Sequence, residues 1–404
     1  MSRRPVRLRI QFAEPWQRTL WVMVLSQLIT QTAFTLALPF LPLFIQRLGV
    51  PGAERAALWA GVSATASGVA MAVMAPVWGR LADRYGAKAM VLRATFAGVV
   101  VVGLMGLVTA PAPLVLLRLL QGLLTGTVSA SNTLVAGAVP PRQLGSSMGL
   151  MQTAVFAGAA GGPLLGGFIA DRLGYRLPFG VTAALLLLSG LLVLFGTERG
   201  THPRPAADPA APRPERPHAR VVGALILPII VVNFLDQLAG SIVGPVLPLV
   251  ISDLSGPDVG HVASQTGAVL GAVAVSASIG ALLSGRLSDR WSAGRVLVYS
   301  AGGAALFAAL QALAPSVLLL GVGRVLMGLC IGGTIPAANA LMGRLIRPEE
   351  RGVAFGLTAS AGAFGFALGP LLGALLVHLD LRAPFLLTGV LLAAEALWVL
   401  RARL

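Results

Sequence analysis

Twelve long apolar stretches constrain this chain more than any other feature of its sequence. Each covers about 20 residues or more, which is enough for a helix to cross a hydrocarbon layer about 30 Å thick. Backbone groups in that layer must be hydrogen-bonded within the segment, and the alternation typical of barrel strands is absent. We therefore expect an all-α membrane protein with 12 transmembrane helices. They cover residues 20–45, 57–79, 89–110, 113–139, 145–170, 176–196, 221–251, 262–284, 295–313, 316–343, 353–378 and 383–400.

The positions of the charged residues predict the topology. Only 11% of the 404 residues are charged, fewer than half the roughly 25% of a soluble domain. Of the 30 Lys and Arg residues, 23 lie in segments on one side of the predicted membrane, five on the other side and two within spans. Because basic loops stay in the cytoplasm, we expect a multi-pass protein of the cell (cytoplasmic or inner) membrane with both termini cytoplasmic. The net charge of +15 is then a topology signal, which argues against nucleic-acid binding.

The chain is expected to consist of two halves. The stretch 198–220 is rich in Pro and Arg and has no periodic apolar residues, as is typical of a flexible linker. We predict an N-terminal six-helix half at 1–196, a cytoplasmic linker at 197–220 and a C-terminal six-helix half at 221–404.

The two halves are related in sequence. An offset of 206 residues takes Gln31 to Gln237 and Arg118 to Arg324. Six helices per half make the copies parallel repeats, which leave a central cleft near the membrane midplane and suggest alternating access. The other pairs at this offset join Gly79, Arg80, Asp83, Arg84 and Gly122 to Gly285, Arg286, Asp289, Arg290 and Gly328.

A glycine and proline pattern repeats in the fifth and eleventh spans. Glycine lets helices approach closely in lipid, and proline weakens the helical ladder. One interpretation is helix packing alone, and the other is a bend that sets the direction of transport or seals the cleft. The residues are Gly149, Gly158, Gly162, Pro163 and Gly166 in one half, and Gly356, Gly365, Gly369, Pro370 and Gly373 in the other.

Several motifs resemble those of a known family. GRLADRYGAKAM at 79–90 is similar to the signature of the major facilitator superfamily, and RLLQG at 118–122 to its fourth-helix motif. The glycine pattern resembles that of its drug:proton antiporters (type 1), and the first span resembles those of MdtG-like multidrug efflux transporters. The resemblance implies the major facilitator fold, export of lipophilic drugs by proton antiport, and a proton-handling role for Arg118.

The same resemblance implies a cytoplasmic latch between the halves. Gly86 permits a tight turn there, and Ala87 stands where the family usually has a basic residue. The alternative is a solvated loop that serves topology only. The predicted latch comprises Gly79, Asp83, Arg84, Gly86, Lys88, Asp289 and Arg290.

Charged residues inside spans are costly unless they are paired or wetted, so they mark candidate sites. Asp236 lies about 14 residues into the seventh span, roughly 21 Å along the helix and near mid-membrane. A carboxylate removed from water can hold and release a proton, so Asp236 is the main proton-coupling candidate, together with Arg118; a structural partnership with a buried arginine is the alternative. Glu395 is close enough to its span end to snorkel to the interface.

Polar residues predict where the two halves meet substrate. Many drug:proton antiporters carry a carboxylate in helix one, whereas this chain has none between Glu14 and Glu54. Asp236 or an interfacial carboxylate must then take that role. The substrate-cleft candidates are Gln27, Gln31, Asn132, Asn233, Gln237 and Asn339.

Rival functions lack the residues they need. A P-loop requires a lysine after glycine, but the only lysine, Lys88, follows Ala87. The four histidines do not pair at metal-ligand spacing, so we expect no enzyme, no metal site and no cofactor beyond the proton gradient. A receptor or scaffold has little use for two copied halves. An exporter or flippase of a lipid-like or metabolite substrate and a proton symporter remain alternatives. The expected partners are small-molecule substrate, protons and membrane lipid, with the chain acting as a monomer.

Overall fold

The computed structural model describes residues 14–197, 219–256, 259–345 and 351–402. Within these ranges every regular element is a helix, as the sequence predicts. The predicted linker at 197–220 lies almost wholly outside the described residues.

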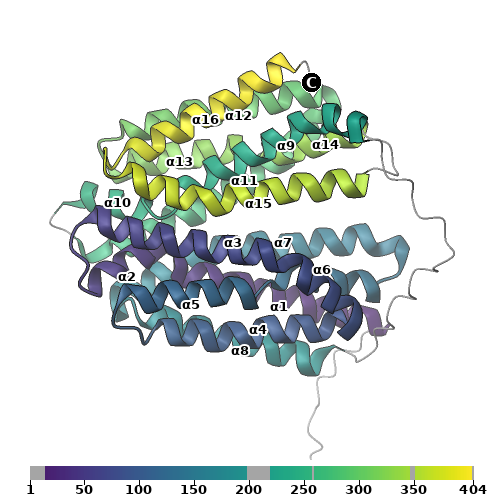
Figure 1. The fold of residues 1–404 in the computed structure, drawn as a ribbon, viewed down its shortest axis with the longest axis horizontal. Helices are drawn as coiled ribbons and strands as arrows, with labels where there is room; N and C mark the ends of the chain where they lie inside the picture. Colours follow the sequence, from purple (N-terminus) through teal and green to yellow (C-terminus); the bar gives the residue numbers. More distant parts are fainter. Residues whose placement is uncertain (1–13, 198–218, 257–258, 346–350, 403–404) are drawn as a thin grey trace, which may run out of the picture.

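The first half runs from α1 to α8 and forms the purple-to-teal part of Figure 1. Its helices are α1 (Pro15–Ala37), η1 (Leu38–Phe40), α2 (Leu41–Arg47), α3 (Ala53–Tyr85), α4 (Ala87–Met105), α5 (Pro111–Leu124), α6 (Thr127–Ala138), η2 (Pro141–Gln143), α7 (Leu144–Leu173) and α8 (Leu177–Gly196).

The second half runs from α9 to α16 and lies beside the first, in green and yellow (Figure 1). Its helices are α9 (Ala219–Ile242), α10 (Leu247–Ser255), η3 (Val259–His261), α11 (Val262–Arg290), α12 (Ala293–Ala312), α13 (Val317–Ile331), α14 (Thr334–Leu345), α15 (Arg351–Leu376) and α16 (Ala383–Arg401). We call the end of the bundle where α8 stops and α9 starts the linker end, and the opposite end the far end.

The predicted set of apolar helices is confirmed, and the structure adds breaks within four of the spans. Eleven stretches of the described residues are long and apolar enough to cross a membrane. The predicted fourth span at 113–139 is two shorter helices, α5 and α6, because the chain turns at Gly126 with φ 131, a conformation that glycine adopts without strain. In the second half, α13 and α14 part at the equivalent place.

The first and seventh spans break at equivalent places too. The helices after the breaks, α2 and α10, start at Leu41 and Leu247, which are 206 residues apart. Each has proline as its second residue, Pro42 and Pro248, where a missing N–H costs nothing. The repeat therefore extends from the sequence to the helix interruptions.

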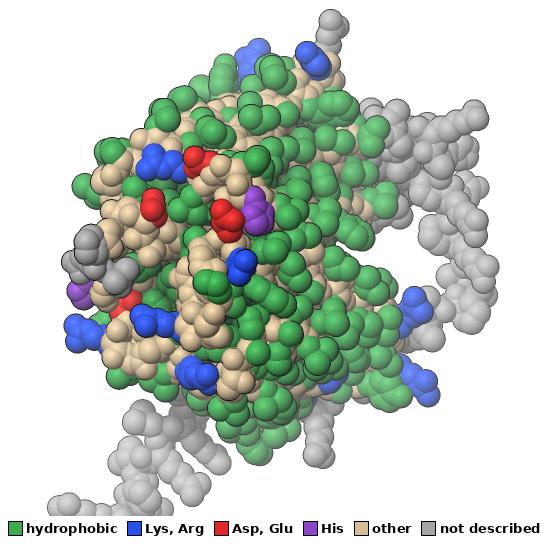
Figure 2. All heavy atoms as spheres, turned by 60° about the vertical axis from the view of Figure 1, so that its left-hand side comes forward, with side chains coloured by type: hydrophobic (Ala, Val, Ile, Leu, Met, Phe, Trp, Pro, Cys, Tyr) green, Lys and Arg blue, Asp and Glu red, His purple; other side chains and the backbone are tan. Residues whose placement is uncertain are grey.

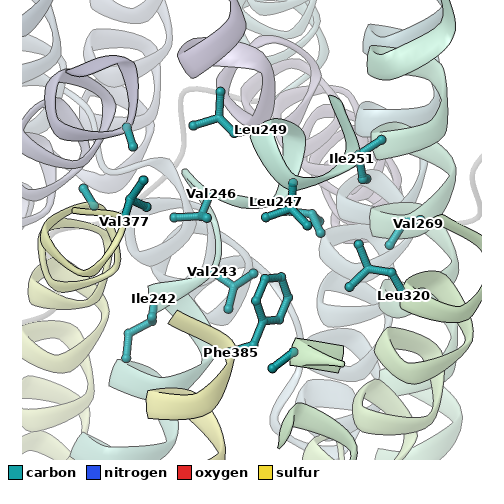
Figure 3. Packing of buried hydrophobic residues seen from close by; sticks show 14 of the residues in the cluster. Ile242, Val243, Val246, Leu247, Leu249, Ile251, Val269, Leu320, Val377 and Phe385 are labelled. Atoms are coloured by element: carbon teal, nitrogen blue, oxygen red, sulfur yellow. The ribbon is translucent and has the colours of Figure 1, made fainter. Parts of the chain in front are cut away.

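The apolar core of each half gathers at these interruptions. Figure 3 shows Val243 and Leu247 at the α9–α10 break, with the Phe385 ring of α16 beside them. The equivalent ring in the first half, Phe179, is as deeply buried and lies 5.0 Å from the Phe44 ring. Each half thus has a core at its interruption, and the core of the second half also includes Leu43 and Ala57 of the first half.

The surface suits lipid. Figure 2 shows a broad apolar surface over the middle and right of the molecule, while most charged side chains gather on the left and centre, toward the far end, and a few lie at the right-hand end. Large apolar residues stand far out of the bundle, such as Leu318 at 77% exposure and Leu107 at 71%. An apolar belt of this extent does not face water in a soluble monomer, whereas a bilayer accommodates it.

The halves contact each other through two equivalent crossings, α7 on α11 and α3 on α15. Glycine permits both: Gly267 faces the carbonyl of Pro163, and Gly61, its repeat partner, faces the carbonyl of Pro370. A Cβ at Gly61 would lie 2.6 Å from that oxygen. Beside this contact, Thr65 Oγ1 donates to the Ala367 carbonyl at 2.6 Å. These contacts lie in the half of each helix nearer the far end.

Candidate functional site

A cavity of about 420 Å³ lies where α3 of the first half meets the second half. Its wall is mostly apolar, and two amide side chains that the sequence singled out, Asn233 and Gln237, belong to it. A site of this size and character suits a small lipophilic molecule held by few polar contacts. The lining residues are Gly68, Met71, Asn233, Gln237, Ile335, Thr358, Ala359, Gly362, Ala363 and Phe366.

The other predicted cleft residues do not line this cavity. Gln27, the repeat partner of Asn233, is buried, and its Nε2 has no partner among the described residues. Gln31 is half-buried beside Gly158, Asn132 is half-buried on α6, and Asn339 is exposed on α14. The cavity therefore draws its polar groups from the second half.

Asp236 lies behind the cavity wall. It stands on α9 next to Gln237 but is only 4% exposed, and its Oδ1 accepts a hydrogen bond from Thr334 Oγ1 at 2.5 Å. Thr334 is the first residue of α14, and the next residue, Ile335, lines the cavity. Asp236 and its partner Thr334 are therefore the sequence neighbours of two residues that line the cavity, Gln237 and Ile335. Sequence reasoning missed Thr334, although a threonine after Gly332 and Gly333 is a typical helix start.

Glu395 corrects a sequence expectation. It does not snorkel: it is 0% exposed on α16, and both of its carboxyl oxygens are buried without a hydrogen-bond partner among the described residues. Its position on the helix face explains this, because Leu392, Ala396 and Val399 on the same face are also buried. Glu395 lies within electrostatic reach of Asp236.

Arg118 and Arg324 occupy equivalent buried places, each 8% exposed. The Arg118 Nη1 donates to Gln121 Oε1 at 2.5 Å, whereas the Arg324 Nη1 faces the sulfur of Met327 at 3.9 Å. In the part of the chain that the structure describes, neither arginine forms an ion pair with Asp236 or another acid. A structural partnership between Asp236 and a buried arginine is therefore not seen there.

Two of the predicted latch residues, Lys88 and Arg84, make contacts inside the first half. Gly86 takes φ 84 in the α3–α4 turn, as expected of a tight glycine turn. Lys88 Nζ donates to the carbonyls of Leu194 at 3.0 Å and Thr197 at 2.5 Å, at the end of α8. Arg84 lies over the Tyr85 ring, Arg290 is exposed, and Gly79 is surrounded by open space. The side chains of Asp83 and Asp289 lie outside the described residues, so the latch stays a prediction.

The glycine pattern packs helices within each half. A Cβ at Gly158 would lie 2.7 Å from the Leu28 carbonyl of α1. Gly166 similarly meets the Leu36 carbonyl, and its counterpart Gly373 meets the Ile242 carbonyl of α9. Gly162, Gly365 and Gly369 make contacts of the same kind, while Gly149 and Gly356 face open space. The packing interpretation accounts for six of these eight glycines.

Polar groups close the far end, and sequence reasoning did not find them. Asp171 of α7 accepts from the backbone N–H groups of Ala263 at 3.1 Å and Ser264 at 2.6 Å, at the start of α11. A carboxylate there complements the positive helix N-terminus. At the other crossing, His378 Nδ1 lies 3.0 Å from Glu54 Oε2.

Tyr175, in the α7–α8 connection, packs against the cores of both halves at this end. Its burial, together with the nearby charge of Asp171, raises the pKa of the Tyr175 phenol. The contacts of Asp171 and His378 follow no obvious sequence signal, since single acids and histidines near span ends are common.

The comparisons with known proteins agree with this geometry. The sequence profile of the Major Facilitator Superfamily matches residues 23–235 and 229–403. The chain belongs to that superfamily. It is 33% identical to the multidrug resistance protein MdtG of Citrobacter koseri over 95% of this chain and 94% of that one. It is 31% identical to the multi-drug resistance efflux pump PmrA of Streptococcus pneumoniae over 89% of each.

Solved structures share the fold. A nucleoside transporter, NupG, superposes with a TM-score of 0.77 at 14% identity, covering 95% of this chain and 99% of that one. A bacterial homolog of the lysosomal transporter Spinster, in an inward-facing conformation, superposes with a TM-score of 0.75 at 17% identity, covering 97% and 98%. The protein is thus a multi-pass membrane transporter of this superfamily and not an enzyme.

Proposed function

We propose that this protein exports small lipophilic compounds, including drugs, in exchange for protons. The cavity between α3 and the second half carries this proposal. Its wall is apolar except for Asn233, Gln237 and Thr358, so it selects for apolar surface more than for a fixed pattern of polar groups. Relatives that match nearly the whole chain bear names of multidrug resistance and efflux proteins.

Alternating access fits the way the halves meet. The crossings of α3 with α15 and of α7 with α11 hold the far end together through glycine contacts and Asp171. We infer that the linker end faces the cytoplasm, in agreement with the basic residues there. Substrate then enters the cavity from the cytoplasm, and the far end opens to release it. Opening requires the far-end contacts to break, so each crossing is a gate.

Protons supply the energy in this proposal, and no cofactor is needed. Asp236 adjoins the cavity residue Gln237 in sequence and has no basic partner among the described residues. A bound proton neutralises it, and substrate binding or helix movement releases that proton. The buried Arg118, held by Gln121, supports the same step from the first half by adding positive charge to the interior.

The test uses everted membrane vesicles that are energised to an acid interior. Lipophilic cations and neutral drugs are added, and collapse of the pH gradient is recorded for the wild type and for Asp236→Asn. We expect several compounds to collapse the gradient with the wild type and none with the variant. Thr30→Val, at the repeat position of Asp236, is the matched control and keeps the exchange.

Two results would change the proposal. If wild type and Asp236→Asn collapse the gradient equally, the proton site lies elsewhere. If no compound acts in vesicles that contain folded protein, multidrug export is refuted, and lipid-like or metabolite substrates or symport are tested instead.

A further inference from the structure

The structure places two acids where the repeat places two hydroxyls. The offset of 206 residues carries Thr30 to Asp236 and Ser189 to Glu395. The same offset relates neighbouring contacts. Thr182 Oγ1 donates to the Ala33 carbonyl at 2.9 Å in the first half, and Thr388 Oγ1 donates to the Ala239 carbonyl at 3.4 Å in the second. The α1–α8 and α9–α16 pairs are therefore in the same register.

In the first half these positions touch. Thr30 Oγ1 and Ser189 Oγ lie 2.8 Å apart, and Ser26 Oγ lies 2.8 Å from the same serine oxygen. All three side chains are buried. The hydroxyl groups satisfy one another, so this cluster is neutral and complete.

In the second half the same two positions hold carboxyl groups. Glu395 is fully buried, has no partner for either oxygen among the described residues, and lies within electrostatic reach of Asp236. Two like charges in a buried site repel each other strongly, and each alone is costly to bury. The pair therefore holds at least one proton unless a cation enters.

No described cation faces the pair. Helices α14, α15 and α16 pack against α9, and α12 packs against α16. Among the described side chains of these four helices, the ionisable groups besides Glu395 are Arg295, Tyr299 and Arg401. All three are exposed, with Arg295 in the first turn of α12 and Arg401 at the end of α16. Helix α13, whose Met327 packs in one apolar cluster with α9 and α16, carries the buried Arg324, which faces the Met327 sulfur.

Thr334 connects the pair to a helix break. Its Oγ1 lies 2.5 Å from Asp236 Oδ1 and 2.7 Å from the carbonyl oxygen of Ile331. A hydroxyl has one hydrogen to donate, and a backbone carbonyl only accepts. If Thr334 donates to both oxygens, it shares that one hydrogen in a weaker three-centre bond. Both contacts are full hydrogen bonds when Asp236 carries a proton and donates it to Thr334, which then donates to Ile331.

Loss of the Asp236 proton changes the hydrogen bonding at the α13–α14 break. The ionised Asp236 carboxylate only accepts, so it takes the Thr334 hydrogen, and the Ile331 carbonyl loses its donor. Ile331 is the last residue of α13 and Thr334 the first of α14, with Gly332 and Gly333 between them. Thr334 thereby links the charge of the pair to the joint between α13 and α14, next to the cavity residue Ile335.

We propose that Asp236 and Glu395 form a shared proton site and that the Thr334 hydroxyl transmits its protonation state to the α13–α14 break. Release breaks the O–H bond of Asp236, sends the proton to water and leaves one negative charge on the pair. This proposal rests on the proposed proton-coupled transport, and it names the second acid and the coupling element.

The pair is tested without transport, by infrared spectroscopy of the purified full-length protein during a pH titration. The carbonyl stretching band of a protonated carboxylic acid reports buried protons directly. Coupled acids titrate in two steps that belong to the pair. Because the other acids of the chain also titrate, the spectra of the double variant Asp236→Asn, Glu395→Gln are subtracted at each pH. In these difference spectra we expect two steps for the wild type and one step each for Asp236→Asn and Glu395→Gln. Thr30→Val with Ser189→Ala, the matched control, keeps both steps.

Two steps that persist in the difference spectra of Glu395→Gln, or wild-type spectra equal to those of the double variant, overturn the pair. This outcome is distinct from failure of drug transport, because the titration needs no substrate. If the protein keeps both titration steps but shows no drug exchange, only the proposed function is refuted.

Thr334 is tested as a positioning residue. Thr334→Val removes the hydroxyl while keeping the shape, and we expect at least tenfold slower exchange with both titration steps present. Thr334→Ser restores the hydroxyl and the rate. Equal rates in Thr334→Val and the wild type would overturn the coupling role.

Discussion

The two halves of this transporter share their scaffold and differ in their chemistry. Both break their first and fourth helices at equivalent places, and both meet the other half through a glycine that faces a proline carbonyl. At one pair of equivalent positions, however, the first half has Thr30 and Ser189, joined at 2.8 Å, and the second half has Asp236 and Glu395. A duplicated fold can keep its backbone contacts while one copy acquires charge.

The lining of the cavity differs between the two halves in the same way. Its amide groups come from α9 of the second half, whereas the equivalent Gln27 and Gln31 of α1 lie outside it. The first half contributes the wall of α3. We therefore assign proton and substrate binding mainly to the second half, and regard the first half as the surface against which it moves.

The largest effect is expected when the second half is given the residues of the first half at these positions. Asp236→Thr combined with Glu395→Ser introduces the hydroxyl pair of the first half. We expect drug-driven proton exchange in vesicles to fall to the background, because no titratable group remains at the pair. Thr30→Val with Ser189→Ala is the control and should keep most of the exchange. Near-normal exchange in the hydroxyl variant would refute the division of roles.

Substitution of the glycines at helix contacts should lower the stability of the protein equally in both halves. In Gly166→Ala and Gly373→Ala the new Cβ meets a backbone carbonyl, of Leu36 and of Ile242, that cannot move aside. We expect each to lower the free energy of unfolding by about 1–3 kcal/mol. Thermal unfolding in detergent measures the loss, and Gly149→Ala, which faces open space, should show none. A large loss in only one of the two variants would mean that the halves pack differently.

The far-end contact of Asp171 should set the balance between closed and open states. Asp171→Ala removes two charge-assisted hydrogen bonds to the start of α11, each worth about 1.5–3 kcal/mol at most. With Cys330 replaced by serine, spin labels at Ala112 and Leu318, which are repeat partners at this end, should show a longer distance population. Asp253→Ala, an exposed acid at the same end, serves as control. An unchanged distance distribution in Asp171→Ala would rule out this gate contact.

The buried arginines offer the smallest and most symmetric test. Arg118 has the acceptor Gln121, while Arg324 faces the sulfur of Met327 at the repeat position. Gln121→Met should lower the free energy of unfolding by about 1–2 kcal/mol, and Met327→Gln should raise it by about 1 kcal/mol or less. Thermal shifts of opposite sign support equivalent environments, and shifts of the same sign argue against them.

Much of the fold could be predicted from the sequence because lipid imposes simple rules on span length and charge position. The repeat offset also placed Arg118 and Arg324 at equivalent sites. The breaks at Gly126 and at Leu38–Phe40 escaped prediction, since helix interruption in an apolar run depends on how neighbouring helices pack.

The site was harder to predict for a geometric reason. Asp236 was found because a mid-span acid is rare, but Glu395 was judged by its distance from the span end. Its helix face, which packs on α9, decides its burial and is not visible from distance along the chain. Thr334, Asp171 and His378 act through partners about 90 residues or more away in sequence, which no local pattern reveals.

If the second half alone binds the transported proton, drug binding should release a proton from the groups of that half. Purified protein in weakly buffered detergent solution is mixed with a drug that it binds, and the pH change is recorded. We expect proton release from the wild type and from Thr30→Val with Ser189→Ala, and none from Asp236→Asn with Glu395→Gln, although that variant still binds the drug. Equal release from the Asp236→Asn, Glu395→Gln protein would contradict this expectation.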